Sequence, residues 1–326
     1  MDAYVQTLTP LNAMIGAAAQ LAFPSLAIGL ASYLAVLEVL WVASRNETFR
    51  ALYGFWSRIF AVCLLLSVVA TLTIGHAVGW SWSGPQLLAA IVAIGCLAWA
   101  MLAGHGRIGA PSHVLVSITM AVLLMTATVW IVTLQHEAPS AGGSVAETLA
   151  SFVLGAFLAT SLLVAAVSAA RLLRRPDEAA SAIALRMSVG MVAICAPLRL
   201  AVGGHAWSLP APAGVGPSPL EAVLGAAVVS LALWAAWLVR RRGGPERSRP
   251  FLHVSLAMGA TGMAALMAGW MASRLGSAAS PSPVVGSLAV LGLWAAYILV
   301  FGAGGYLIVR LAARPFDEPT DAPGQG

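Results

Sequence analysis

Long apolar runs alternate with short polar segments along the whole chain. Runs of about 18 or more apolar residues can cross a hydrocarbon core of roughly 30 Å as helices. Nine such runs are present, at 16–42, 52–75, 86–103, 112–134, 148–170, 180–202, 220–239, 251–273 and 284–309. The connections between them are short and rich in Gly, Pro and Ser, which leaves no room for a soluble domain. The pattern predicts an all-α polytopic membrane bundle of nine helices. We expect a single membrane domain over residues 1–314 and a polar tail at 315–326.

Composition supports the same class of protein. Hydrophobic residues make up 60% of the chain and charged residues 9%, which excludes a water-soluble core and shell. The three cysteines lie singly inside predicted spans, without the spacing of a disulfide framework or a zinc site.

The 17 basic residues are all arginine, and their placement predicts the orientation of the helices. With nine spans, the odd-numbered loops and the C-terminus share one side of the membrane. Fifteen arginines lie on that side or just inside it, and only Arg199 and Arg274 fall opposite. An excess of arginine marks the cytoplasmic face, so we expect the N-terminus outside and the C-terminus inside. Because the arginines flank apolar spans, they indicate topology, and no nucleic-acid partner is expected.

Short motifs in the first two spans resemble a known family. The order Gln-Leu-Ala-Phe-Pro, then Leu-Ala-Ile-Gly, then Leu-Glu, then Phe-Trp-Ser-Arg-Ile-Phe runs from Gln20 to Phe60. This order resembles the first two membrane helices of cytochrome bd quinol oxidase subunit I, at the same spacing. The similarity continues through Gly104, Arg107, Gly109 and His113 and returns at Ala-Gly-Trp, residues 268–270. The resemblance implies a nine-helix subunit of a respiratory oxidase that uses b- and d-type haems and quinol.

The same alignment places other residues where the family holds its haems. Gln20 stands at the position of a histidine ligand early in the first helix. Ser151 and Glu221 stand at the positions of a histidine in helix five and a methionine in helix seven. Neither serine nor glutamate is a usual axial ligand of low-spin haem. The resemblance therefore implies vestigial haem positions, and we expect no cofactor in the isolated chain.

The quinol-binding loop of the family is also reduced, to residues 203–219, where His205 is the only ionisable side chain. Quinol binding is therefore left open. His76, His136 and His205 share the predicted extracytoplasmic side and are the candidate substitutes if the haem ligands have moved. Histidines at span ends are more often amphipathic end residues, which is the interpretation we favour here.

Polar groups inside the spans need partners. An ionised carboxylate at a span centre costs about 2.5–3.5 kcal/mol on insertion scales. We expect Glu38 to pair with Arg58 and Arg199 to pair with Glu221. Ser151, Gly155 and Ala159 recur every four residues, which places small residues on one helix face for close packing.

These observations lead to one preferred function and two alternatives. The preferred hypothesis is a haem-poor supporting subunit of a respiratory quinol oxidase or related electron-transfer complex. Such a subunit would not be catalytic alone, and would pair with a second bd-type subunit in the lipid of a bacterial cytoplasmic membrane. The alternatives are an active haem-binding subunit with relocated ligands, and a transporter or channel unrelated to electron transfer.

Overall fold

The computed structural model describes residues 2–77, 84–103, 110–136, 145–202, 248–275 and 302–314, together with a few single residues between 225 and 233. The described chain is helical, as predicted. The helices are α1 (Asp2–Ser44), α2 (Glu47–Ala77), α3 (Gly84–Ala103), α4 (Ala110–His136), α5 (Val145–Arg174), α6 (Ala179–Val202) and α8 (Arg249–Leu275). Residues 302–312 form a further helix, called the C-terminal helix here.

Seven of the nine predicted spans fall wholly within these helices. Four described segments are long and apolar enough to cross a membrane, namely Ala22–Ser44, Glu47–Val69, Phe152–Arg174 and Ala179–Arg199. Two shorter apolar helices cover Val92–Leu102 and Pro111–Thr126. Most of the predicted spans at 220–239 and 284–309 and the tail at 315–326 lie outside the described residues. The all-α membrane bundle is therefore confirmed, while the count of nine spans and the orientation of the termini stay predictions.

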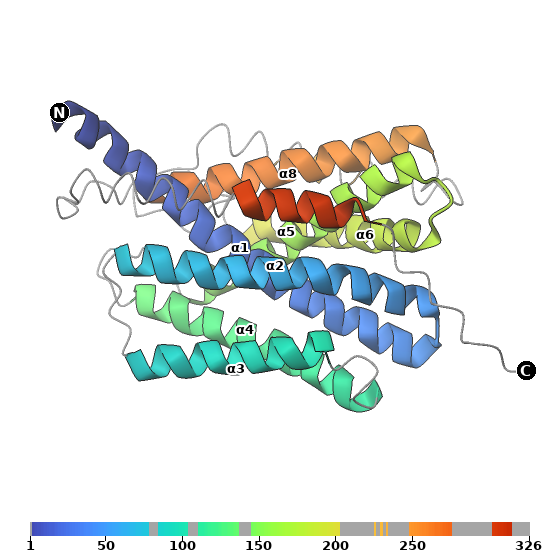
Figure 1. The fold of residues 1–326 in the computed structure, drawn as a ribbon. Helices are drawn as coiled ribbons and strands as arrows, with labels where there is room; N and C mark the ends of the chain where they lie inside the picture. The colour runs from blue at the N-terminus through green and yellow to red at the C-terminus, as the bar shows by residue number, and fades with distance from the viewer. Residues whose placement is uncertain are drawn as a thin grey trace, which may run out of the picture.

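The helices lie side by side along one long direction, with α3 and α4 on one side of the bundle and α8 on the other (Figure 1). Helix α1 is central, because it packs against α2, α4, α5 and α8. Helix α5 packs against α6 and α8 as well. Leu30, Ala31 and Leu34 of α1 and Ala156 of α5 are completely buried in the resulting core.

Small residues bring the central helices close together. A Cβ added to Gly29 of α1 would lie 2.6 Å from the carbonyl oxygen of Ala156 and would overlap the side chain of Thr160 on α5. A Cβ on Gly259 of α8 would lie 2.6 Å from the Cβ of Ala166 and 2.8 Å from a backbone oxygen of α5. Such backbone approaches are typical of membrane helices, which gain association energy from close packing because lipid supplies no hydrophobic driving force.

Eight arginines of the described chain lie at one end of the bundle. Gly259 packs beside Ala166 and Gly262 beside Leu162, so α8 runs antiparallel to α5. The start of α8 therefore lies level with the end of α5. The other arginines of this group follow α1, begin α2 or end the C-terminal helix, and Figure 1 shows these ends together. The set comprises Arg45, Arg50, Arg171, Arg174, Arg175, Arg249, Arg310 and Arg314. We call this the arginine-rich end.

Candidate functional site

Four helices meet at a buried polar cluster near the arginine-rich end. The cluster consists of Glu38 on α1, Tyr53 on α2, His113 and Ser117 on α4, and the backbone carbonyl of Met101 on α3, and we call it the Glu38 cluster. Glu38 is 1% exposed and His113 2% exposed. Glu38 lies six residues before the end of α1, which is about 9 Å along the helix axis. The cluster is therefore within the span, one to two turns below the arginine-rich end.

Hydrogen bonds connect every member of the cluster. One carboxylate oxygen of Glu38 is bound to Nδ1 of His113, and the other accepts a bond of 2.5 Å from the Ser117 hydroxyl. The Ser117 hydrogen is thereby used, so the Tyr53 hydroxyl at 3.4 Å acts as donor to Ser117. Nε2 of His113 lies 3.1 Å from the carbonyl oxygen of Met101 and donates to it. The rings of Tyr53 and His113 pack edge to face, with 5.7 Å between their centres.

Sequence reasoning identified Glu38 as a buried group that needs a partner but did not identify His113 as that partner. The described hydrogen bonds of Glu38 run to α4, and its expected pairing with Arg58 stays a prediction. Glu38 and His113 are 75 residues apart, so helical spacing does not relate them. The available signal was their common depth: both lie near span ends on the side predicted to be cytoplasmic.

A second buried charge lies between α5 and α6. Arg199 is 1% exposed, and its guanidinium lies against Gly155, where an added Cβ would be 3.1 Å from Cζ of the arginine. Gly155 thus makes room for a side chain, whereas the close approach of α5 to α1 uses the neighbouring face at Ala156 and Thr160. Ala159 is fully buried and the side chain of Ser151 is outside the described set, so the packing stripe stays a prediction. Glu221, the expected partner of Arg199, lies outside the described residues.

On α5 the structure describes the residues that follow Ser151, and Arg199 lies against one of them. Gly155 follows Ser151 by one helical turn, and the space against it holds the guanidinium of Arg199. Serine is not a usual haem ligand. Of the described histidine side chains, His113 has both ring nitrogens hydrogen-bonded, and His253 is exposed and binds the carbonyl of Arg249.

Other predicted site residues are placed only in part. Gln20, His76, His136 and Ser151 lie in α1, α2, α4 and α5 respectively, and their side chains are outside the described set. His205 lies outside the described residues altogether. In the part of the chain that is described, no three His, Cys, Asp or Glu side chains come together as a metal site would need.

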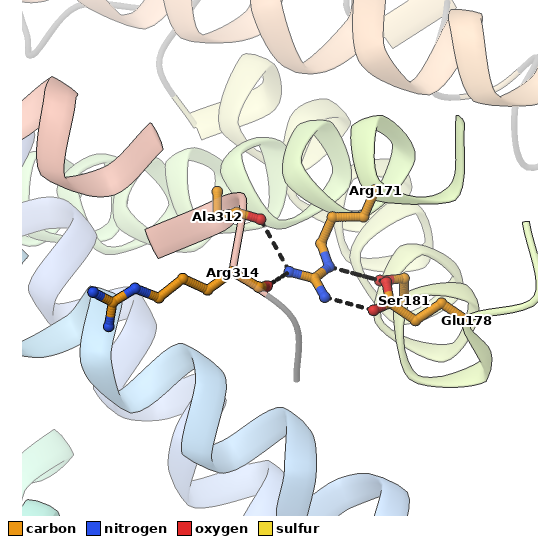
Figure 2. A network of polar contacts seen from close by, with 5 residues as sticks. All are labelled: Arg171, Glu178, Ser181, Ala312 and Arg314. Carbon is orange, nitrogen blue, oxygen red and sulfur yellow. Dashed lines mark hydrogen bonds and ion pairs between the residues drawn. The ribbon is translucent and has the colours of Figure 1, made fainter. Parts of the chain in front are cut away.

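A third polar network fastens the arginine-rich end, and it was not foreseen from the sequence. Figure 2 shows the Arg171 guanidinium of α5 between Glu178 and the end of the C-terminal helix. It donates to both carboxylate oxygens of Glu178, at 2.5 and 3.0 Å, and to the carbonyls of Ala312 and Arg314, at 3.0 and 2.6 Å. It also stacks on the ring of Phe55, 4.7 Å from the ring centre. A cation here satisfies the carbonyls that a helix end leaves without partners.

The fold and the buried polar groups define a multi-pass, all-helical membrane protein, and comparisons with known proteins narrow that class. Residues 10–137 match the family model described as cytochrome bd terminal oxidase subunit I. A chain of the bd oxidase structure from Geobacillus thermodenitrificans superposes with a TM-score of 0.77 at 14% identity, over 94% of this chain and 97% of that chain. No curated protein sequence matches. The chain is a cytochrome bd oxidase subunit I-like membrane protein with the bd oxidase fold. The matched range includes the whole Glu38 cluster.

Proposed function

We propose that the chain is a haem-poor supporting subunit of a respiratory quinol oxidase or a related electron-transfer complex. In this proposal residues 1–314 form one membrane domain in a bacterial cytoplasmic membrane, with the tail at 315–326 in the cytoplasm. The chain pairs there with a second, haem-bearing bd-type subunit. It covers part of the lipid-facing surface of its partner and stabilises the complex.

The observation that carries the proposal is the buried guanidinium of Arg199 against Gly155. The resemblance assigns a haem ligand to Ser151, one turn earlier on α5, and a cation fills the space that follows. A haem that reached this space would have to displace a charged side chain that is 1% exposed. The fold supports the rest of the proposal, because the likeness to bd oxidase extends over nearly the whole chain while the residues at the expected ligand positions differ.

Haem content tests the proposal directly. The chain is expressed alone and together with a bd-type partner subunit from the same source, and haem per chain is measured from the reduced-minus-oxidised visible spectrum. We expect no stoichiometric haem on the isolated chain, and co-purification with a partner whose own haem content is unchanged by the pairing.

Stoichiometric haem on the isolated chain would refute the proposal. The variants His76→Ala, His136→Ala and His205→Ala then identify relocated ligands, with His253→Ala as the matched control at the arginine-rich end. Loss of the haem signal in any of the first three, and not in the control, would establish the active-subunit alternative.

A further inference from the structure

The hydrogen bonds of the Glu38 cluster fix the number of protons that it holds. Nε2 of His113 faces a carbonyl oxygen, which only accepts, so Nε2 carries a hydrogen. Nδ1 faces a carboxyl oxygen of Glu38, and one hydrogen must lie between these two atoms for them to bond. The second carboxyl oxygen is already an acceptor from Ser117. Glu38 and His113 together therefore hold one proton more than a carboxylate beside a neutral imidazole.

That proton leaves the buried pair without net charge. On Nδ1 it gives a carboxylate next to an imidazolium, and on Glu38 it gives a carboxylic acid next to a neutral ring. Both arrangements keep all the bonds of the cluster and are neutral as a pair. Compensation of this kind lowers the cost of burying an ionisable group at this depth in a membrane span.

Loss of the proton would break the cluster. The neutral imidazole has one N–H, but its two nitrogens face two acceptors on different helices. One nitrogen would then present a lone pair either to the Glu38 carboxylate of α1 or to the Met101 carbonyl of α3. A buried negative charge would also remain. Helix α4 would lose its bond to one neighbour or the other.

We propose that the Glu38 cluster is a proton-binding site, which holds one exchangeable proton between Glu38 and His113 and whose deprotonation releases α4 from α1 or α3. The proposal stands on the hydrogen-bond geometry and is independent of whether the chain binds haem. The ligand is the proton itself, and the second effect is mechanical, because the bonds between three helices depend on it.

The structure describes several charged and titratable groups on the helices around the cluster. On α2 they are Tyr53, whose hydroxyl bonds to Ser117, together with Glu47, Arg50 and Arg58, and on α3 the contact is the Met101 carbonyl. Of the other helices that pack on α1 or α4, α5 carries Arg171, which is bound to Glu178, and the start of α8 carries Arg249 and His253, both exposed.

The variant Glu38→Gln separates the proton from the bonds. The amide can donate from its NH₂ group to Nδ1 of a neutral His113 and accept from Ser117 with its oxygen, while Nε2 still donates to Met101. All contacts are kept and no exchangeable proton remains. The matched control is Glu47→Gln, which removes the same charge at the same end from a side chain that is 56% exposed.

The measurement is the thermal unfolding midpoint of the purified full chain as a function of pH. Unfolded glutamate and histidine lose their protons at about pH 4.3 and 6.5, so above about 6.5 the unfolded pair holds none. Folding then takes up one proton, and the folding constant of the wild type falls by up to about tenfold per pH unit as the pH rises. We expect Glu38→Gln to lose this dependence and Glu47→Gln to keep it.

Equal pH dependence in the wild type and in Glu38→Gln would overturn the proposal. If Glu38→Gln does not fold, the ¹⁵N resonances of the histidine rings in the wild type give a second answer. The His113 resonance is assigned by its absence in His113→Gln. We expect its Nδ1 signal to move in a single step, together with amide signals of α3 or α4. A His113 signal that does not move up to the pH of unfolding, or that moves while the amide signals of α3 and α4 stay unchanged, contradicts the site.

Discussion

The close approach of α1 and α5 at Gly29 makes this glycine an informative position for a stability measurement. In the variant Gly29→Ala the new Cβ would lie 2.6 Å from the carbonyl oxygen of Ala156 and would overlap Thr160. The carbonyl belongs to the α5 backbone, so it can retreat only if the two helices separate. Overpacking of this kind costs about 1–3 kcal/mol, while alanine regains up to about 1 kcal/mol of helix propensity. With the full propensity gain subtracted, the expected net loss is up to about 2 kcal/mol.

Gly54→Ala is the matched control, because Gly54 lies inside α2 and an added Cβ there would meet no atom within 4 Å. This variant should gain up to about 1 kcal/mol through helix propensity alone. Both variants are measured by the unfolding midpoint in the same detergent. Opposite signs support the close approach. If Gly29→Ala is as stable as Gly54→Ala, α1 and α5 do not touch at this point and the packing argument is wrong.

Two further substitutions test the arginine sites by the same unfolding assay. Arg171→Ala should destabilise the chain by about 3 kcal/mol, because it leaves the carboxylate of Glu178 without its buried partner. The control Arg174→Ala, at an exposed neighbour, should change the stability by no more than about 0.5 kcal/mol. Equal effects of the two variants would mean that the Arg171 network does not hold the helix end. Gly155→Ala should lower the stability by less than Gly29→Ala does. The guanidinium of Arg199 is the end of a flexible side chain and can shift, whereas a backbone carbonyl cannot. A larger loss in Gly155→Ala would show that Arg199 is held rigidly.

Hydropathy was sufficient to predict the helices, because each span must satisfy its own backbone in lipid and be long enough to cross it. The helix α4, for example, covers Ala110–His136, and the apolar run predicted 112–134. Helix ends extend beyond the apolar runs, as at residues 2–15 of α1, because residues outside the hydrocarbon also continue a helix. The length of an apolar run therefore gives no information about how far the helix extends beyond it.

Partners of buried polar groups could not be predicted in the same way. Glu38 has a carboxylate that requires a partner at its own depth, and both Arg58 and His113 meet that condition in the sequence. The choice depends on which face of α1 turns toward α2 and which toward α4, and this is set by packing along the whole helix. Spans that are apolar on all sides have little amphipathic character, so the sequence does not show how α1 is rotated about its own axis.

The two halves of the described bundle contain different buried polar groups. The family-matched range, 10–137, contains all of the Glu38 cluster, whose bonds join four helices and need no haem. Arg199 and Gly155 lie outside that range, and there the structure has a buried cation one helical turn after Ser151, the position to which the resemblance assigns a haem ligand. The polar cluster in one half and the buried cation in the other support the proposal that the chain acts in assembly and not in electron transfer. Haem content and the pH response of Glu38→Gln test these two halves separately, because neither outcome depends on the other.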